Sequence, residues 1–523
     1  MLRGLQAVAL GAMARKVSVA IVGAGFGGVA AAVKLKQQGQ DDIVILERGE
    51  RIGGVWRANV YPGIACDVPS HLYSLSFATN PDWSKRFSPG SEIRAYLQGV
   101  ADRFGVTPLI RFNADVERAT FDESSGRWRL EVANGEDVEA EVLITACGQL
   151  TRASIPDVPG LDRFKGPMFH SAHWDEQFDP AGKRVAVIGT GASAIQFVPA
   201  IAEKVAHMTI FQRSAPWVLG KTDREYPERV KRLHRRLPIL PRMWRRGWQL
   251  MFETLVPVFT RPDSFAGRVN KVLYTVLSQA NRFAQLRGDR RLWKATTPDT
   301  PVGCKRILIT ADWYPTLRRE NVELVDRGIT EVTEDGVVDS DGRTHPADAI
   351  VFGTGFKTTE FLAPMEVHGR DGIRLNEDAW AHGGEAYLGI TVTGFPNMFL
   401  LYGPNTNHGT GSAVEMLEME ADYAVKAIGL IANGVVDRLE VKREAYERFV
   451  REMDERLAHS VWVRGANWYV NEEGRVTNNW PGSQAEYRRR TKAVVLADYL
   501  TAGSGTPPTG TAATGSPAES SAS

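Results

Sequence analysis

The sequence contains little cysteine and no long apolar segment. Its 523 residues include three cysteines, Cys66, Cys147 and Cys304, which are odd in number and far apart. A disulfide framework or a cysteine-based metal site is therefore not expected, and no metal site of another kind is predicted. No stretch reaches the roughly 18 uninterrupted apolar residues that a membrane-spanning helix needs. These absences favour a globular protein in the reducing cytoplasm.

The sequence also lacks an excess of charge of either sign. It has 63 Lys and Arg residues against 62 Asp and Glu residues, a formal net charge of +1. This balance argues against a polyanionic partner such as nucleic acid. With 43% hydrophobic residues the chain can bury several cores, and at about 150 residues per domain its length predicts about three domains.

The two ends of the chain have unusual compositions. The first 16 residues combine a basic start with a short apolar run, as a signal peptide does. A β-strand pattern begins directly afterwards at Val17, so we expect an irregular leader rather than a cleaved signal. Residues 502–523 are rich in Gly, Pro, Ser and Thr, and we expect a disordered tail there.

The most specific motif is a glycine-rich turn between a strand and a helix. An apolar run from Val17 to Val22 precedes the turn, and an Ala-rich helical pattern follows it and ends near Gly39. A second apolar run, Ile43–Leu46, ends at an acidic residue. The glycines would bring the backbone and the helix N-terminus close to a pyrophosphate, and the carboxylate would accept hydrogen bonds from ribose hydroxyls. These residues are Gly23, Gly25, Gly28 and Glu47.

The same unit recurs later in the chain. A strand ending at Ile188 leads to Gly189 and Gly191, with Ala194 in the third position, followed by a helix and a strand from Met208 to Phe211. The interval from Gly189 to Arg213 equals that from Gly23 to Glu47, so an arginine replaces the acid. A guanidinium pairs with a 2′-phosphate, which a carboxylate would repel. The first unit therefore predicts FAD, and the second predicts NADPH rather than NADH.

Two dinucleotide units in one chain are typical of flavoproteins in which a nicotinamide reduces a flavin. Disulfide reductases of this architecture carry a CxxxxC pair soon after the first unit, and this chain has none. Oxygen is therefore the predicted electron acceptor.

A segment before the second unit resembles the signature FxGxxxHxxxW of the flavin-dependent Baeyer-Villiger monooxygenases. Its four fixed positions are Phe164, Gly166, His170 and Trp174. Further segments resemble the family in the same order, and the resemblance extends from about Val17 to Leu500. They are residues 51–77, 303–306 (GCKR), 348–356 and 394–407, and the late NWYV and NWPGS segments.

The fold class predicted from the two units and the resemblance is α/β, with two Rossmann-like dinucleotide-binding domains. Residues 1–150 and 356–501 would form a discontinuous FAD-binding domain. Residues 151–228 and 303–355 would form the NADPH-binding domain, and residues 229–302 a helical insertion in it.

The resemblance implies a reaction in which NADPH reduces FAD and the reduced flavin forms a peroxide with O2. As an anion, this peroxide would attack a ketone carbonyl and give an ester or lactone. Arg306 matches the family's catalytic arginine, a cation that is not neutralised near pH 7. Asp67 matches the carboxylate that orients this arginine. The implied partners are a small-molecule ketone and O2, with no obligatory protein partner.

The resemblance also implies roles for residues around the cofactors. Lys305 and Arg213 match a clamp on the 2′-phosphate, and Trp468 matches an aromatic residue that closes over the nicotinamide ribose. Trp56 and Tyr73 match flavin-contacting aromatics, with Asn405 beside the flavin ring. His170 would couple the movement of the two nucleotide domains rather than transfer a proton.

Between Glu228 and Pro301, apolar residues recur at helical spacing among basic ones, and prolines divide the run. This pattern predicts a subdomain of short amphipathic helices that packs on the core and shapes a substrate channel. A basic membrane-surface face is the alternative. We expect residues here and at 408–412 to determine substrate choice.

Three other functions are compatible with the sequence. A protonated flavin peroxide would oxygenate sulfur or nitrogen, or hydroxylate. An NADPH oxidase or reductase would release hydrogen peroxide or pass electrons to a partner. A nucleotide-sensing binding module would lack the catalytic arginine, so the GCKR motif argues against it.

Overall fold

The computed structural model describes residues 14–465 and 467–502. Most of the predicted leader (residues 1–13) and of the disordered tail predicted over residues 502–523 (residues 503–523) lies outside these residues. The prediction is wrong for Ala502. Ala502 closes strand β20 (Tyr499–Ala502), which pairs with β19 (Arg438–Val441).

The larger of two main sheets contains the first glycine-rich unit. In this unit β1 (Arg15–Val22) and β2 (Ile43–Glu47) run parallel on either side of the turn into α1 (Phe26–Gln37). The strand order is β17-β4-β5-β6-β1-β2-β3, and β18 also pairs with β6. The further strands are β3 (Ile110–Phe112), β4 (Asp115–Asp122), β5 (Arg127–Ala133), β6 (Val138–Thr145), β17 (Glu366–His368) and β18 (Met398–Leu400).

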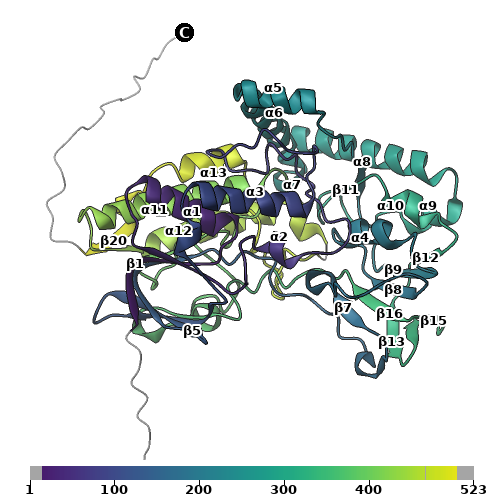
Figure 1. The fold of residues 1–523 in the computed structure, drawn as a ribbon, viewed down its shortest axis with the longest axis horizontal. Helices are drawn as coiled ribbons and strands as arrows, with labels where there is room; N and C mark the ends of the chain where they lie inside the picture. Colours follow the sequence, from purple (N-terminus) through teal and green to yellow (C-terminus); the bar gives the residue numbers. More distant parts are fainter. Residues whose placement is uncertain (1–13, 466, 503–523) are drawn as a thin grey trace, which may run out of the picture.

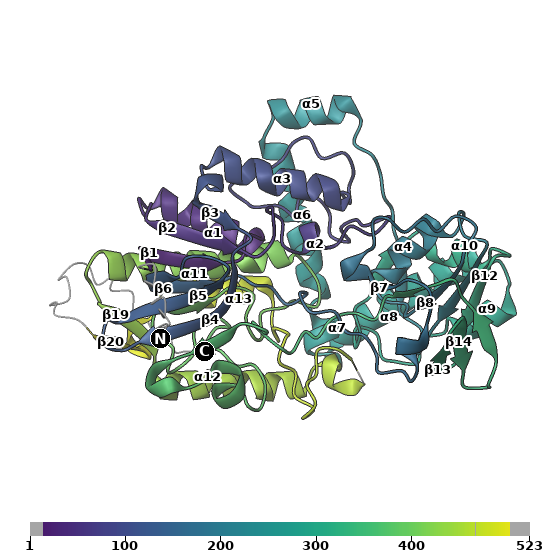
Figure 2. The ribbon, with the colours of Figure 1, turned by 60° about the horizontal axis from the view of Figure 1, so that its bottom comes forward.

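The second main sheet contains the second unit and lies beside the first (Figure 2). It is entirely parallel, with the order β12-β9-β8-β16-β7. Its strands are β7 (Met168–His170), β8 (Arg184–Ile188), β9 (His207–Phe211), β12 (Val322–Val325) and β16 (Ala349–Phe352). Smaller pairings join β10 (Val218–Gly220) to β11 (Leu308–Thr310), and β13 (Ile329–Thr333) to β14 (Gly336–Asp339) and β15 (Thr344–Pro346).

Helices from distant parts of the chain cover the sheets. Helix α1 packs against α11 (Ala413–Ala432), and both lie over the first sheet with α3 (Gly90–Arg103) (Figure 1). Buried alanines and valines of α1 allow this close packing. Helices α4 (Ala194–Ile201) and α10 (Trp313–Leu317) pack together beside the second sheet. We call the first sheet with its covering helices the first region, and the second sheet with its helices the second region. The first region also contains the short helices α2 (Val55–Ala58) and α13 (Gln484–Arg490) and the longer α12 (Arg443–Ala458).

The predicted insertion is helical from Glu228 to Ala295. Its helices are α5 (Glu228–Arg236), α6 (Ile239–Leu255), α7 (Pro257–Thr260), α8 (Phe265–Leu286) and α9 (Arg290–Ala295). Prolines divide the run as predicted, at Pro238, Pro257 and Pro262. The prediction of short helices is wrong for two of them, because α6 has 17 residues and α8 has 22. Pro241 lies in the first turn of α6, where its missing N–H costs nothing, and α8 contains no proline.

The predicted fold class, α/β with two Rossmann-like units and a helical insertion, is confirmed. Strands from residues 15–145 and 366–400 form the first sheet, and strands from 168–211 and 322–352 form the second. The domain boundaries themselves stay a prediction. None of the described helices is long and apolar enough to cross a membrane.

Candidate active site

One cavity of about 1620 Å³ connects both glycine-rich turns. Gly23 and Gly25 line it on the first side, and Gly189 and Gly191 on the second. Gly23 and Gly189 have nearly the same left-handed φ, 103° and 104°. A Cβ atom would lie 2.6 Å from the Ala146 oxygen at Gly23 and 2.5 Å from the Gly353 oxygen at Gly189. Both turns therefore exclude any side chain, as a cradle for a pyrophosphate requires.

Glu47 is fixed at the end of β2 beside the first turn. Its carboxylate accepts hydrogen bonds from the N–H groups of Ala24 and Gly49, both at 2.8 Å, and from Arg57 Nη2 at 3.4 Å. Only 4% of the residue is exposed, and it lines the cavity. The acid is thus held in place by the fold before any ribose reaches it.

Basic residues gather at the second turn. Arg213 follows β9, is exposed and lines the cavity. Lys305 lines the same part, and its Nζ donates a hydrogen bond to Ser214 Oγ at 2.6 Å. Arg327 is a further cavity-lining cation that sequence reasoning missed. The positive charges of these residues fit the 2′-phosphate of NADPH, the cofactor that the position of Arg213 in the sequence predicts.

Arg306 and Asp67 form an ion pair in the cavity wall between the two turns. Arg306 Nη2 and Nε donate to Asp67 Oδ2 at 2.6 Å and 3.1 Å. The carboxylate raises the pKa of Arg306 above its ordinary value, so the guanidinium stays charged. Because 43% of the Arg306 side chain is accessible, the charge faces the cavity.

The predicted aromatic residues also line this cavity. Trp56 Nε1 donates to Tyr73 Oη at 3.0 Å, and the two rings meet edge to face. The rings of Trp468 and Tyr469 are tilted by 35° with centroids 4.0 Å apart, and both residues line the cavity. The aromatic surfaces therefore lie at the junction that a flavin and a nicotinamide would share.

Comparisons with known proteins agree with this geometry. A family described as FMO-like, flavin-binding monooxygenase-like, matches residues 15–246. A Baeyer-Villiger monooxygenase of Streptomyces coelicolor is 44% identical over 488 residues, covering 92% of each chain. A Baeyer-Villiger monooxygenase of Pseudomonas aeruginosa is 41% identical over 491 residues, covering 93% of this chain and 92% of the other. The chain belongs to the Baeyer-Villiger monooxygenase family.

Solved structures of the family have the same fold. A structure described as oxidized steroid monooxygenase bound to NADP superimposes with a TM-score of 0.81 at 30% identity, covering 93% of this chain and 99% of the other. A closed structure of cyclohexanone monooxygenase gives a TM-score of 0.83 at 25% identity, covering 94% of this chain and all of the other. This Baeyer-Villiger family member is therefore an FAD-dependent NADPH monooxygenase.

The family signature lies behind the cavity rather than in its wall. His170 ends β7, is buried, and accepts a hydrogen bond at Nδ1 from the Ala172 N–H at 3.1 Å. Burial lowers the pKa of His170 to about 4, so the ring is neutral. Trp174 packs against Phe169 and Phe197 of the second region. The predicted coupling role of His170 stays a prediction.

The other two signature residues, Phe164 and Gly166, contribute to packing. Phe164 is buried in the core of the second sheet, and a Cβ at Gly166 would lie 2.4 Å from the Asp348 oxygen. The cavity instead reaches the neighbouring Ala172 and His173.

Two predicted cofactor residues do not line the cavity. A Cβ at Gly28 would lie 1.9 Å from the Gly23 oxygen, so this glycine allows the helix to pack on the turn. Asn405 is buried, and its side-chain amide donates to the carbonyls of Val476 and Asn479 at 3.2 Å and 3.3 Å. Asn405 thus joins its own loop to the loop of residues 476–479 behind the cavity wall. Asn407, in the same segment as Asn405, lines the cavity.

Sequence reasoning missed a clamp between the two regions. Gln196 of α4 accepts hydrogen bonds from Tyr61 Oη at 3.1 Å and from the Ala65 N–H at 3.3 Å, and its amide donates to the Ala65 oxygen at 2.9 Å. The loop that carries Asp67 is therefore attached to the second region. Gln196 is more than 130 residues away from Tyr61 and Ala65 in the sequence, so no local sequence pattern could have indicated these hydrogen bonds.

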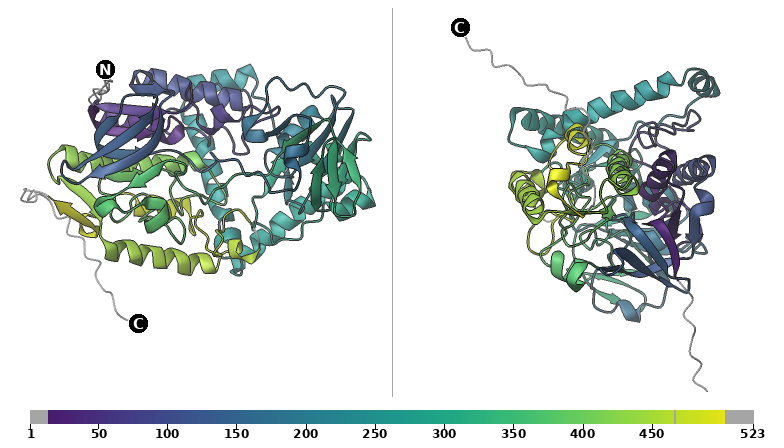
Figure 3. Two further views of the ribbon diagram at one scale, coloured as in Figure 1. Left: turned by 90° about the horizontal axis from the view of Figure 1, so that it is seen from below. Right: turned by 90° about the vertical axis from the view of Figure 1, so that its left-hand side faces the viewer.

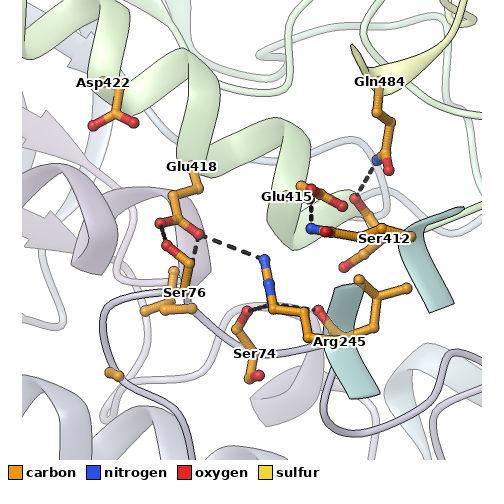
Figure 4. A network of polar contacts seen from close by, with 12 residues as sticks. Ser74, Ser76, Arg245, Ser412, Glu415, Glu418, Asp422 and Gln484 are labelled. Carbon is orange, nitrogen blue, oxygen red and sulfur yellow. Dashed lines mark hydrogen bonds and ion pairs between the residues drawn. The ribbon is translucent and has the colours of Figure 1, made fainter. Parts of the chain in front are cut away.

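A buried polar network fixes α6 against the first region (Figure 4). Arg245 Nη1 donates to the carbonyls of Leu72 and Ser74 at 2.9 Å and 2.5 Å, and its Nη2 lies 3.8 Å from the Glu418 carboxylate. Glu418 also accepts a hydrogen bond from the Ser76 N–H at 3.0 Å. One of the many arginines of the predicted basic run is thus an internal anchor.

The insertion forms the apolar end of the cavity. Trp248, Phe252 and Leu255 of α6 and Tyr274 of α8 line it. Residues 407–411 also line the cavity, and a Cβ at Gly409 would lie 2.9 Å from Phe259 of α7. His408 Nε2 lies 3.0 Å from the Gly482 oxygen, and burial lowers the pKa of His408. Among the described residues, no group of three or more His, Cys, Asp and Glu side chains could hold a metal ion.

Proposed function

We propose that this protein uses NADPH and O2 to insert one oxygen atom beside the carbonyl group of an apolar ketone, giving an ester or lactone. The observation that carries the proposal is the Arg306–Asp67 pair in the cavity between the two dinucleotide turns. The family relatives named Baeyer-Villiger monooxygenase support it. When bound, FAD would accept a hydride from NADPH and supply the chemistry that activates O2.

Arg306 stabilises the negative charge that the reaction requires. Attack on a carbonyl places negative charge on its oxygen, and a fixed cation in a cavity of low polarity stabilises this charge before it forms. The guanidinium is suited to this role because the pKa of Arg306 is raised further by Asp67. It therefore carries its charge throughout the physiological pH range.

Asp67 positions the arginine. Nε and Nη2 both donate to one Asp67 oxygen, which fixes the plane of the guanidinium. Among the hydrogen bonds of the described residues none involves Nη1 of Arg306, so this group can bind an oxygen of the substrate. The Tyr61–Gln196 clamp holds the Asp67 loop, and thus the arginine, at a fixed place between the two regions.

The apolar wall determines the class of ketone. Trp248, Phe252 and Leu255 offer no charge to a substrate and exclude water from the reacting atoms. We propose that the substrate is an apolar ketone whose carbonyl group points toward Arg306. We also propose that the enzyme acts in the cytoplasm, which the three free cysteines support.

The test is turnover of the FAD-loaded enzyme with NADPH and ¹⁸O₂ on a panel of cyclic and linear ketones, with sulfides of matched size beside them. We expect esters or lactones that carry one ¹⁸O atom, formed in proportion to the NADPH consumed. Release of hydrogen peroxide in proportion to NADPH with every ketone would overturn the proposal. Sulfoxides as the only products would replace it with heteroatom oxygenation.

A further inference from the structure

Helix α8 has its apolar and polar faces reversed relative to a helix that packs on a core. Its buried positions include Asn270, Ser278 and Arg282, whereas large apolar side chains point outward. Asn270 Nδ2 donates to the Thr254 carbonyl at 2.7 Å and Arg282 Nη1 to the Thr296 carbonyl at 2.9 Å, so backbone carbonyls hold these two side chains inward. The exposed apolar residues are Phe265, Val269, Val272, Leu273, Val276, Leu277 and Phe283.

Helix α6 carries a second set of exposed apolar residues. Ile239, Met243, Trp244, Leu250 and Met251 are exposed along it. Helices α5, α6 and α8 lie on one side of the molecule, uppermost in Figure 1 and in the right panel of Figure 3. Phe265, Val272 and Phe283, spread along the length of α8, are 78%, 62% and 73% exposed, and contiguous exposed apolar surface of this kind marks an interaction site. We call the exposed apolar residues of α6 and α8 the apolar face.

The segment that carries the apolar face is strongly basic. Residues 229–302 contain 16 Lys and Arg residues and four Asp and Glu residues, a net charge of +12 in a chain whose net charge is +1. Arg242 and Arg246 on α6, and Arg268 and Lys271 on α8, are exposed between the apolar residues. An apolar surface among cations complements an anionic lipid surface, with Trp244 suited to the headgroup region.

The apolar face is continuous with the wall of the cavity. Met251, Leu273 and Leu277 are exposed and also line the cavity, and Trp248, Phe252 and Tyr274 continue the lining inward. A substrate dissolved among lipid chains would therefore meet apolar side chains along the whole path from the surface to the cavity.

We propose that the apolar face binds the surface of an anionic lipid bilayer, and that the ketone enters the cavity from the bilayer. The second statement rests on the proposed function, whereas the first does not. A second copy of this chain is a poorer occupant, because two segments of net charge +12 would repel each other. Nucleic acid would match the charge and leave the outward apolar side chains of α8 in water.

The test is flotation of the FAD-loaded enzyme with phosphatidylcholine vesicles, with and without phosphatidylglycerol. We expect the enzyme to float with the anionic vesicles and to be released as the salt concentration rises. The quadruple variant F265Q/V272Q/V276Q/F283Q leaves the charge unchanged and should bind these vesicles at least about tenfold more weakly. None of its four positions lines the cavity.

The control is V495Q/L500Q, which changes two exposed apolar residues outside the apolar face. Val495 precedes β20 and is 49% exposed, and Leu500 lies in β20 and is 48% exposed. The control should float as the wild type does, and the quadruple variant should keep its bound FAD and its turnover of a water-soluble ketone. This readout separates loss of docking from loss of the fold.

Three results would overturn the docking proposal. The wild type would remain unbound, the quadruple variant would float equally well, or sedimentation would show a dimer of the wild type that the quadruple variant loses. A wild type that floats but converts no ketone would leave the docking intact and refute the proposed function instead.

Discussion

The two dinucleotide units have the same backbone and differ in the side chain at the end of the second strand. Gly23 and Gly189 adopt the same φ within a degree, and each turn would clash with any side chain. Glu47 is buried and held by two backbone N–H groups, whereas Arg213 is exposed at the cavity. From this comparison we propose that the backbone of each turn holds a pyrophosphate and that one side chain per unit selects the ribose.

The difference in burial between Glu47 and Arg213 also bears on how long each cofactor would stay bound. A buried acid that is already hydrogen-bonded suits a group that remains bound, because its desolvation has been compensated during folding. An exposed arginine suits a cofactor that enters and leaves with each turnover. We therefore propose that FAD stays bound at the first unit and that NADPH enters and leaves at the second.

The largest effect should follow from Glu47→Ala. The substitution leaves the N–H groups of Ala24 and Gly49 without their acceptor, at about 1–3 kcal/mol each, and removes the ribose contact. We expect a protein that retains little FAD, measured by the ratio of flavin to protein absorbance. Glu50→Ala, at an exposed residue, is the control. Full FAD content in Glu47→Ala would show that the acid does not hold the ribose.

Arg306→Ala tests the residue that joins the two units. We expect bound FAD to stay near the wild-type level while oxygenated product falls by at least about 10²-fold, the effect of removing one stabilising donor. Product yield and FAD content are measured on the same sample. Arg306→Lys keeps the charge and loses the double contact with Asp67, so its product yield should lie between those of the wild type and Arg306→Ala. Near-normal yield from Arg306→Ala would refute the assignment.

Arg213→Glu should change the choice of nicotinamide cofactor and leave FAD unaffected. Loss of charge-assisted hydrogen bonds worth about 1.5–3 kcal/mol predicts a fall of roughly 10- to 100-fold in kcat/KM for NADPH. The value for NADH should change little, because NADH lacks the 2′-phosphate. Arg319→Glu, outside the cavity on the same region, is the control. Equal losses with both cofactors would contradict the assignment.

His170→Asn should have the smallest effect on activity. With the pKa of His170 lowered to about 4, the ring does not titrate between pH 6.5 and 8.5, so kcat should keep its pH profile there. Stability differs, because between pH 6.5 and 4 the unfolded chain binds a proton that the folded one does not. The wild type should therefore lose stability as the pH falls through this range, and the variant should lose less. Thermal unfolding across this range, with the activity profile beside it, tests both statements.

Much of the fold follows from local sequence pattern. The two glycine-rich units, their strands and their helices lie where the apolar periodicity and the glycine spacing predict them, because these signals act within about 30 residues. The same spacing distinguishes Glu47 from Arg213. Resemblance to the family then indicated Arg306 and Asp67, and the structure places both in one cavity.

Only the tertiary structure decided which residues share the site and which support it from behind. Asn405 belongs to a motif of the family, yet its amide is used by the carbonyls of Val476 and Asn479. Gln196 and Arg245 act through partners far away in the sequence, and no spacing encodes such contacts. The helical periodicity of α8 predicted an amphipathic helix, but periodicity is the same whichever face packs inward. The direction in which its apolar side faces was set by the backbone carbonyls that Asn270 and Arg282 reach in the folded chain.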